Sequence, residues 1–476
     1  MLKNILLVLF FVFVGVFLGG CEKKEINTEA QNGTNQPKIE LYFYNLFDDS
    51  EIFAPFIQQY ENSRPGVKIH YKKFVDVKKY EKMLIDEIAN GEGPDIFALN
   101  NSLFLYHRKK ISPAPESIFS PNLFREIFVP VAANDLILYD NEIEKVFGLP
   151  LSVDTLALYY NESHFKDVFP SRPYPAADWE TFLGDILSLK KSDHSIYRFT
   201  RAAVALGRTD NILRGLDFIF FLLLQNKTIF YAQDFSSAVF ATPQGVDSDG
   251  KIRTPGREAL ELFTAFAQSN NQLYTWNEIL ADPQFDYEIY PFLTGRVSMI
   301  AGYSYLYDQL KNKLATLKKD PDSLRVKSDI ENLVDVNDIK ITSWPQKGSG
   351  TGNSIYLANY FPLTVSRTSK NPLYAWDFLK FLTTQENLRY YHEKTKRPTS
   401  RRDLIEEQSM EDLMGIFARQ LNGAASLPIF NSQRFEEIFS EAVNLVITGR
   451  KSTRDVLKEA EDKVTELLKE ENKNVQ

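Results

Sequence analysis

The sequence is poor in cysteine and histidine and has no excess of basic residues. Among 476 residues there is one cysteine, Cys21, so no disulfide can form within the chain. The five histidines are scattered, and none has the spacing to another histidine or to the cysteine that metal sites need. Lys and Arg number 55 against 63 Asp and Glu, a net charge of −8, without a basic stripe. Nucleic acid is therefore not expected as a partner.

Motifs for nucleophilic catalysis and nucleotide binding are also missing. The chain contains no G-x-S-x-G, no P-loop and no G-x-G-x-x-G. The glycine-rich stretch 348–352 lacks the lysine and the following helix of a phosphate-binding loop. We therefore predict no catalytic residue, no metal and no cofactor. Two carboxylates far apart in the sequence would leave no motif, so a glycan hydrolase stays open as an alternative.

One long apolar run is present, at the N-terminus. Residues 5–18 follow a lysine and are too few for a membrane span of about 20 residues, but they are typical of a signal-peptide core. The run ends in Leu18-Gly-Gly-Cys21, which resembles the lipobox of bacterial lipoproteins. The resemblance implies a lipoprotein signal peptide (1–20) and lipidation of Cys21; an uncleaved anchor is the alternative. The polar residues 21–37 predict a flexible, lipid-anchored tether.

The remaining chain alternates strand and helix patterns. Apolar runs predict strands at 39–44, 67–74 and 96–99, with amphipathic helices between them. This β-α-β-α-β order is typical of a mainly parallel sheet covered by helices. The stretch 212–224 is apolar almost all round, which predicts a buried helix. The chain is too long for a single core, so we expect at least two domains.

Six segments, spread in order over most of the chain, resemble one family. They are Gly93-Pro-Asp-Ile96, 147–161, 179–182, 292–300, 366–382 and Arg397-Pro-Thr-Ser-Arg-Arg402. The family is that of the extracellular solute-binding proteins of ABC transporters, family 1, the sugar type similar to maltose-binding protein. The resemblance implies an α/β, two-lobed, periplasmic-binding-protein-like (type II) fold with two mainly parallel-cored sheets flanked by helices.

The same resemblance implies how the chain is divided. Hinge crossovers are expected near 151–153, near 357–360 and near Leu404. The expected lobes are 38–152 with 358–405, and 153–357 with 406–476.

The resemblance also implies a function. We expect the protein to capture a small solute, a carbohydrate, between its lobes and to deliver it to ABC permease subunits without catalysis. It would be a monomer, anchored to the cell membrane through the lipid on Cys21 and facing outside. A surface sensor or adhesin of the same fold, without an import role, is a further alternative.

Candidate ligand residues in the first lobe follow strands. Asn45 comes after the first strand, and Asn100 and Asn101 come after the third. Ligands of open α/β sheets collect beyond the carboxyl ends of strands, and these positions correspond to binding positions of the family. The alternative is that these amides only shape turns. Asp49 is a weaker candidate, because it also suits the start of the following helix.

Asp154, Asn211, Tyr303 and Tyr305 are candidates from the second lobe. Asp154 matches a family hinge position that contacts sugar hydroxyls, with a hinge salt bridge as the alternative. Tyr303 and Tyr305 match the place where a family aromatic residue stacks on sugar. Asp210 is expected to cap the apolar helix, which leaves Asn211 to face the cleft.

Two further candidates come from later segments. Trp344 follows a strand and belongs either to the site or to the core. Arg434 lies in the segment that supplies a late aromatic residue in the family, where it would pair with an anionic solute.

Overall fold

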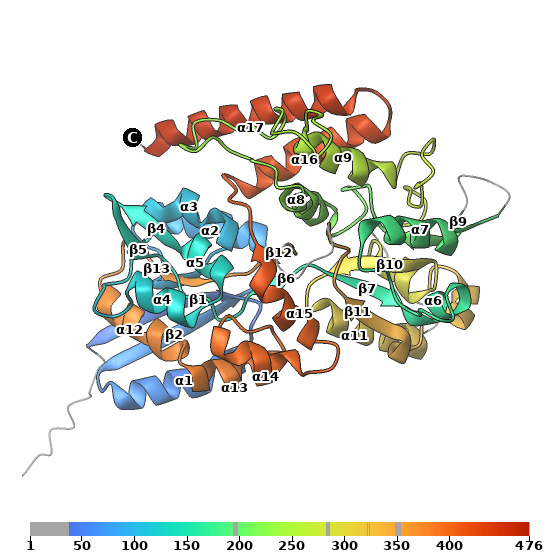
Figure 1. Ribbon diagram of the computed structural model, residues 1–476. Helices are drawn as coiled ribbons and strands as arrows, with labels where there is room; N and C mark the ends of the chain where they lie inside the picture. The colour runs from blue at the N-terminus through green and yellow to red at the C-terminus, as the bar shows by residue number, and fades with distance from the viewer. Residues whose placement is uncertain are drawn as a thin grey trace, which may run out of the picture.

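The computed structural model describes residues 38–193, 199–281, 286–320, 322, 324–347 and 354–475, with side chains up to Glu470. The predicted signal peptide, the tether with Cys21 and the stretch 348–352 lie outside these residues. Figure 1 shows two lobes side by side, each built from a sheet with helices around it.

The sheet of the first lobe has the predicted parallel centre. Its strands are β1 (Ile39–Leu46), β2 (Val67–Phe74), β3 (Ile96–Ala98) and β13 (Leu363–Val365), in the order β13-β3-β1-β2. β1 pairs in parallel with both β2 and β3, and β13 runs antiparallel to β3. The crossovers are α1 (Ser50–Ser63) and α2 (Val77–Ala89), as the β-α-β-α-β pattern predicts.

Helix α2 shows why the sequence folds this way. The Asp76 side chain accepts a hydrogen bond from the Lys79 amide and so caps the helix start. Gly91 adopts a φ of 76° just beyond the helix end, a left-handed conformation that glycine tolerates. The chain can then turn directly into the buried strand β3.

The sheet of the second lobe is mixed rather than mainly parallel. Its strands are β8 (Lys191–Ser192), β9 (Phe199–Val204), β10 (Val297–Gly302), β7 (Ala157–Asn161) and β11 (Ile339–Thr342), ordered β11-β7-β10-β9-β8. Only the pairing of β10 with β9 is parallel among these strands. The expectation of a mainly parallel core is therefore wrong for this sheet, because β7 enters from the hinge between two antiparallel neighbours.

A short three-stranded sheet lies where the chain passes between the lobes. β12 (Tyr356–Asn359) pairs antiparallel with β6 (Asp154–Thr155) and parallel with β14 (Ala424–Ala425). We call this sheet the hinge. The third passage is longer than the predicted one near Leu404, because Phe417 packs in a second-lobe cluster and Leu421 in the first-lobe cluster.

Separate hydrophobic clusters build the two lobes. One cluster joins buried residues between Leu41 and Val153 with residues between Ala358 and Leu421. The second-lobe sheet has one cluster on each face: on β7, Leu158 and Tyr160 face one, while Ala157 and Tyr159 face the other. This alternation is the period of a strand buried on both faces.

Helices and a hairpin complete the first lobe. They are α3 (Phe104–His107), α4 (Pro121–Ile127), α5 (Pro130–Leu136), β4 (Ile137–Asp140), β5 (Ile143–Val146), α12 (Pro372–Leu382) and α13 (Gln385–Thr395). The third passage contains α14 (Ile405–Ser409) and α15 (Gly415–Gln420).

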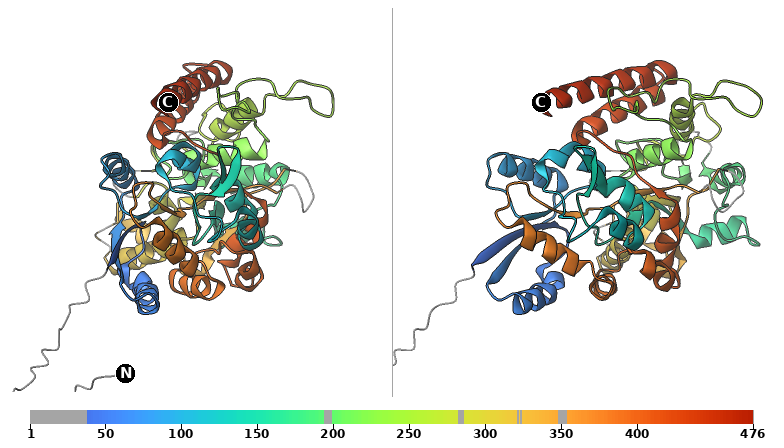
Figure 2. Two further views of the ribbon diagram at one scale, coloured as in Figure 1. Left: turned by 90° about the vertical axis from the view of Figure 1, so that its left-hand side faces the viewer. Right: turned by 60° about the vertical axis from the view of Figure 1, so that its left-hand side comes forward.

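The second lobe carries the remaining helices. They are α6 (Glu162–Val168), α7 (Trp179–Leu189), α8 (Gly215–Gln225), α9 (Pro255–Ala265), α10 (Ile289–Leu293), α11 (Leu306–Lys319), α16 (Ser432–Ile447) and α17 (Thr453–Val475). Helix α8 is buried, as its all-round apolar sequence predicts. Helices α16 and α17 lie along one end of the molecule in every view (Figures 1 and 2).

Candidate functional site

A cleft of about 630 Å³ lies between the two lobes. Its lining comes from the ends of β1 and β3, from the hinge, from α8 and α16, and from the segment that follows β10. Some of the predicted ligand residues line it, namely Asn45, Asn100, Asn101, Asp154, Tyr303 and Tyr305.

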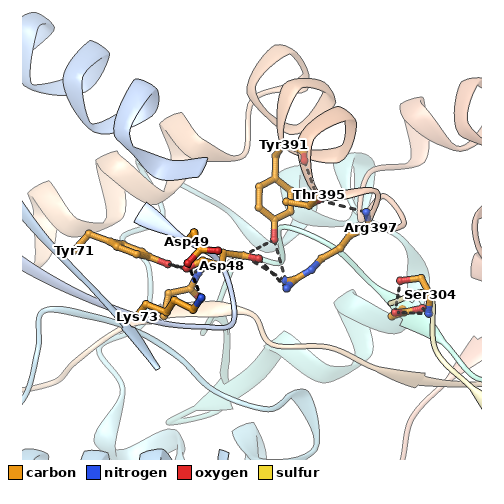
Figure 3. Close-up of polar contacts among 10 residues, drawn as sticks. Asp48, Asp49, Tyr71, Lys73, Ser304, Tyr391, Thr395 and Arg397 are labelled. Carbon is orange, nitrogen blue, oxygen red and sulfur yellow. Dashed lines mark hydrogen bonds and ion pairs between the residues drawn. The ribbon is translucent and has the colours of Figure 1, made fainter. Parts of the chain in front are cut away.

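A buried carboxylate forms the centre of the first-lobe side of the cleft. The Asp48 side chain is 6% exposed, and its Oδ1 lies 2.8 Å from Nη2 of Arg397. The Tyr391 hydroxyl donates to Oδ2 of Asp48 at 2.8 Å, and Nη1 of Arg397 donates to that hydroxyl oxygen at 3.0 Å. Figure 3 shows these three side chains converging from the segment after β1, from α13 and from the segment after α13. Burial raises the pKa of Asp48, against the opposing effect of Arg397.

Asn45, a predicted ligand residue, lies beside this group. Its amide donates to the Tyr71 hydroxyl at 3.4 Å and to Oδ2 of Asp48 at 3.5 Å. The Tyr71 hydroxyl in turn donates to the backbone oxygen of Asp48 at 2.7 Å. We call Asn45, Asp48, Tyr71, Tyr391 and Arg397 the first-lobe wall.

Two aromatic rings extend the first-lobe side of the cleft. Phe47 is 39% exposed and has a φ of 71°, which is rare for a bulky residue. Its amide donates to the Phe74 oxygen at 2.7 Å, and its ring packs edge-on against Phe361 at 5.6 Å between centroids. Both rings line the cleft.

The paired asparagines line the cleft, but contacts within the protein occupy their amides. Asn100 donates to Oδ1 of Asn359 at 2.8 Å and accepts from the Ser102 amide and hydroxyl. Asn101 donates to Oδ2 of Asp135 at 2.9 Å and accepts from the Tyr360 amide. Both asparagines therefore tie β3 to neighbouring segments, and the turn alternative describes much of their role.

Asp135 is buried beneath this junction. Besides Asn101, the Tyr360 hydroxyl donates to it at 2.7 Å, and so does the Ser426 hydroxyl. Burial raises the pKa of Asp135 to about 6, although these hydrogen bonds oppose the shift.

Asp154 begins the hinge strand β6 and lines the cleft. Its Oδ2 accepts from the Ser304 hydroxyl at 2.6 Å and from the Ser304 amide at 3.0 Å. Figure 3 includes Ser304 in this group of contacts. Burial raises the pKa of Asp154 to about 6, against the hydrogen bonds from Ser304. The contacts of Asp154 that the structure describes are hydrogen bonds rather than the hinge salt bridge.

Two tyrosines form the opposite side of the cleft. The rings of Tyr303 and Tyr305 stack with centroids 6.2 Å apart and planes 25° apart. The Arg214 guanidinium lies 5.2 Å from the first ring centroid and 5.6 Å from the second, and it donates to the Tyr305 hydroxyl. Arg214 also contacts Asp217 at 3.4 Å. We call Arg214, Asp217, Tyr303 and Tyr305 the second-lobe wall.

The second-lobe wall keeps unused hydrogen-bonding capacity. The Tyr303 hydroxyl is buried close to the Asp217 carboxylate and the Asn359 side chain, but it has no hydrogen bond of standard geometry with any residue that the structure describes. Burial raises the pKa of this phenol well above its usual value, so it stays protonated and can donate. A solute in the cleft would offer the partner that the hydroxyl lacks.

Four predicted ligand residues lie elsewhere. Asp49 is 69% exposed and forms a surface ion pair with Lys73, since the chain turns at Phe47 and points Asp48 inward instead. Arg434 is exposed, pairs with Glu437, and lines a separate groove of about 310 Å³ between α16 and α17. The neighbouring Phe435 lines the cleft in its place.

Asn211 and Trp344 belong to the interior of the second lobe. Asn211 accepts from the Trp276 indole at 3.0 Å and donates to the Asn277 oxygen at 2.9 Å. Trp344 is 1% exposed and packs against Phe218 with centroids 4.4 Å apart. The predicted cap is also wrong, because α8 begins at Gly215 and Asp210 pairs with Arg208.

The sequence prediction does not include six charged or tyrosine residues of the two walls. They are Asp48, Tyr71, Arg214, Asp217, Tyr391 and Arg397. A signal for Asp48 was present, because it follows β1 as closely as Asp49 does. Arg214 and Asp217 were visible as charges at the start of an otherwise apolar helix, which is where a buried helix meets a polar cleft.

Neither a metal site nor a membrane-spanning helix is found in the described part of the chain. No group of three or more His, Cys, Asp or Glu side chains there is arranged to hold a metal ion. Among those same residues, no helix is both long enough and apolar enough to cross a membrane.

Comparison with known proteins gives one family match and several relatives. A family model described as bacterial extracellular solute-binding protein matches residues 55–418. The multiple sugar-binding protein of Streptococcus mutans is 20% identical over 401 residues, which make up 83% of this chain and 81% of that protein.

Solved structures with the same fold are numerous. The sugar-binding protein MalE of Xanthomonas citri is 15% identical, with a TM-score of 0.70 over 91% of this chain and 98% of its own. The GacH receptor of Streptomyces glaucescens, solved unliganded and with acarbose, is 15% identical, with a TM-score of 0.65 over 90% of this chain and 98% of its own. These similarities confirm the predicted fold class.

Proposed function

Because the chain belongs to the family of bacterial extracellular solute-binding proteins, we propose that it captures a carbohydrate in the cleft between its lobes and delivers it to an ABC importer. The observation that carries the proposal is the second-lobe wall, where two stacked tyrosines stand beside an arginine, an aspartate and a phenol without a hydrogen-bond partner.

This wall suits a sugar for a chemical reason. A pyranose offers C–H faces that pack on aromatic rings and hydroxyls that need polar partners, so its sites combine both kinds of group. The relatives support the same class of solute, since the matched protein of S. mutans and the MalE protein of X. citri are both named as sugar-binding.

The proposed ligand residues combine the two walls with the hinge. From the sequence prediction we retain Asn45, Asp154, Tyr303 and Tyr305, with Asn100 as a hinge contact. We add Asp48, Arg214, Asp217 and Arg397, because they line the same cleft. We assign Asn101 a supporting role, since its amide is used by Asp135 and Tyr360.

We propose binding without catalysis, by closure of the two lobes on the solute. A solute that contacts both walls binds the closed state better than the open one and so shifts the population toward it. Three carboxylates of the cleft have partners within the protein that fit this role, since Asp48 and Asp217 contact arginines and Asp154 accepts a hydrogen bond from Ser304. We propose the lobes expected from the sequence, 38–152 with 358–405, and 153–357 with 406–476, except that the third passage between them extends to Leu421, which packs in the first-lobe cluster.

The family description gives a location outside the cell. We propose that the chain is held there as a monomer through lipid on Cys21, after removal of residues 1–20, and that ABC permease subunits accept the solute. Mass spectrometry of the membrane fraction would detect a diacylglyceryl group on Cys21, and an intact residue 1–20 segment would contradict this part.

Thermal-shift screening tests the class of solute. The panel contains neutral oligosaccharides, peptides, polyamines and organic acids at millimolar concentration. We expect the melting temperature to rise with at least one saccharide, because a ligand that binds only the folded state stabilises it. A rise with another class and none with any saccharide would overturn the carbohydrate proposal. Glycan products after long incubation would overturn the absence of catalysis.

A further inference from the structure

Two helices from different lobes touch at the cleft. Nζ of Lys78 on α2 lies 2.8 Å from Oε2 of Glu436 on α16. The Ser432 hydroxyl on α16 donates to Oε2 of Glu81 on α2 at 3.0 Å. All four residues line the cleft.

Each helix is fixed within its own lobe. Helix α2 buries Tyr80, Leu84 and Ile88 in the first-lobe cluster. Helix α16 buries Phe435, Ile438 and Phe439 in the second-lobe cluster. The two polar contacts therefore join the lobes directly, next to the chain segment before α16, where the Ile429 amide also donates to the Ser102 oxygen at 2.8 Å. In Figure 1, α2 belongs to the left-hand lobe and α16 lies above the hinge strands β12 and β6.

The spacing of the four residues places the two contacts next to each other along α2 and α16. Residues three or four apart share one face of a helix, as Lys78 and Glu81 do on α2 and Ser432 and Glu436 do on α16. Ser432 is the first residue of α16, so the Glu81 carboxylate stands at a helix N-terminus, where the helix dipole favours a negative charge. The chain enters α16 through Asn431, whose φ of 117° is unusual for a residue with a side chain.

We propose that Lys78, Glu81, Ser432 and Glu436 form a latch that holds the two lobes together in the absence of solute. The latch sets how much of the protein is closed before capture, and the observed affinity scales with that closed fraction. This inference rests on the proposed closure of the lobes, but not on the identity of the solute.

The latch is weak enough to open. Lys78 is 70% exposed and Glu436 is 49% exposed, and such surface ion pairs change an equilibrium by only about 1.5- to 5-fold. The contact between Glu81 and Ser432 is more sheltered, because both side chains are partly buried, and this burial raises the pKa of the Glu81 carboxyl. A latch of this strength biases the lobes toward closure and still lets a solute enter and leave.

Distances between the lobes, measured without solute, test the latch. Spin labels go on cysteines introduced at the exposed helix positions Glu126 in α4 and Glu180 in α7, in a full-length chain with Cys21→Ser. Double electron–electron resonance then reports the distance distribution. We expect Lys78→Glu and Glu436→Lys each to add a longer distance, because each sets like charges face to face. The combined exchange should restore the original distribution.

Matched controls separate the latch from general effects of charge. Lys79→Glu makes the same change on α2, where Lys79 is 88% exposed and pairs with Asp76. Glu441→Lys makes it on α16, where Glu441 pairs with Lys463. Neither control should change the distances, and all variants should melt near the parent chain.

Several outcomes would overturn the latch. One is an unchanged distribution in both single reversals, and another is a failure of the double exchange to restore it. A third is an equal effect of the controls. Since no solute is present, these outcomes are independent of the thermal-shift screen for carbohydrate.

Discussion

The two walls of the cleft differ in how completely their polar groups are used. In the first-lobe wall, Asp48, Tyr391 and Arg397 bond to one another at 2.8–3.0 Å. In the second-lobe wall, Arg214 contacts Asp217 at 3.4 Å, and the Tyr303 hydroxyl has no hydrogen-bond partner among the described residues.

This difference indicates a division of labour. A network whose members are mutually satisfied is stable without solute and offers a rigid surface. The second-lobe wall has a donor without a hydrogen bond, the Tyr303 hydroxyl, and a ring that is 40% exposed, that of Tyr305. It therefore gains more contacts than the first-lobe wall when a solute binds. We therefore expect substitutions in the first-lobe wall to change stability most, and those in the second-lobe wall to change affinity most.

The largest effect is expected from Arg397→Ala in the first-lobe wall. It leaves the buried Asp48 carboxylate without its cation, a change that typically costs about 3–5 kcal/mol of unfolding free energy. Urea denaturation of the whole chain at pH 7 measures this loss. Arg389→Ala removes an exposed ion pair with Glu407 and serves as the control. A loss below about 1 kcal/mol would contradict a rigid first-lobe wall.

The pH dependence of stability tests two buried carboxyls outside the walls, those of Asp135 and the hinge residue Asp154. Burial raises the pKa of Asp135 from 3.8 to about 6. Between these values the folded state holds a proton that the unfolded state has released, so the unfolding free energy falls as pH rises from about 4 to about 6. Each such group contributes at most about 1.4 kcal/mol per pH unit.

Urea denaturation at pH 4, 5, 6 and 7 measures this contribution. Asp135→Asn removes the titrating group and should flatten the fall between pH 4 and 6 relative to the parent chain. Asp154, whose pKa is also raised to about 6, should behave in the same way. An unaltered slope in both variants would mean that these carboxyls are ionised throughout.

Removing single hydroxyls compares the walls directly. Tyr303→Phe should leave stability within about 0.5 kcal/mol, since its hydroxyl bonds to no described residue, and should weaken solute binding about 5- to 30-fold. Tyr391→Phe should cost about 1–2 kcal/mol of stability, since its hydroxyl bonds to Asp48 and Arg397. Isothermal titration and urea denaturation measure the two effects, and a reversed pattern would contradict the division.

The smallest effects are expected outside the walls. Asp49→Ala and Arg434→Ala each remove an exposed ion pair, so stability should change by less than about 0.5 kcal/mol and affinity by less than twofold. The same titration measures both. A tenfold loss of affinity in either variant would show that the substituted residue contributes to the binding site.

Much of the architecture could be predicted from the sequence. The β-α-β-α-β start and the buried α8 follow from apolar periodicity and helix-ending residues, and the resemblance to the solute-binding family is confirmed by the family match. The placing of Asn45, Asp154, Tyr303 and Tyr305 in one cleft also agrees with the prediction.

The remainder depends on tertiary contacts that a local pattern does not contain. Asp48 and Asp49 are equivalent in the sequence, and only the backbone turn at Phe47 decides which carboxylate faces Arg397, about 350 residues away. Trp344 and Asn211 look suitable for a ligand in the sequence. In the structure, Trp344 packs against Phe218, and Asn211 accepts a hydrogen bond from the indole of Trp276. The mixed second sheet likewise follows from how β7 leaves the hinge.

Isothermal titration with the saccharide that gives the strongest thermal shift tests the central account most directly. For the parent chain we predict one site per chain with a dissociation constant in the micromolar range, about −8 kcal/mol. The Tyr305→Ala variant should bind at least about tenfold more weakly at unchanged stability. Binding of equal strength in both proteins would contradict the assignment of the cleft as the carbohydrate site.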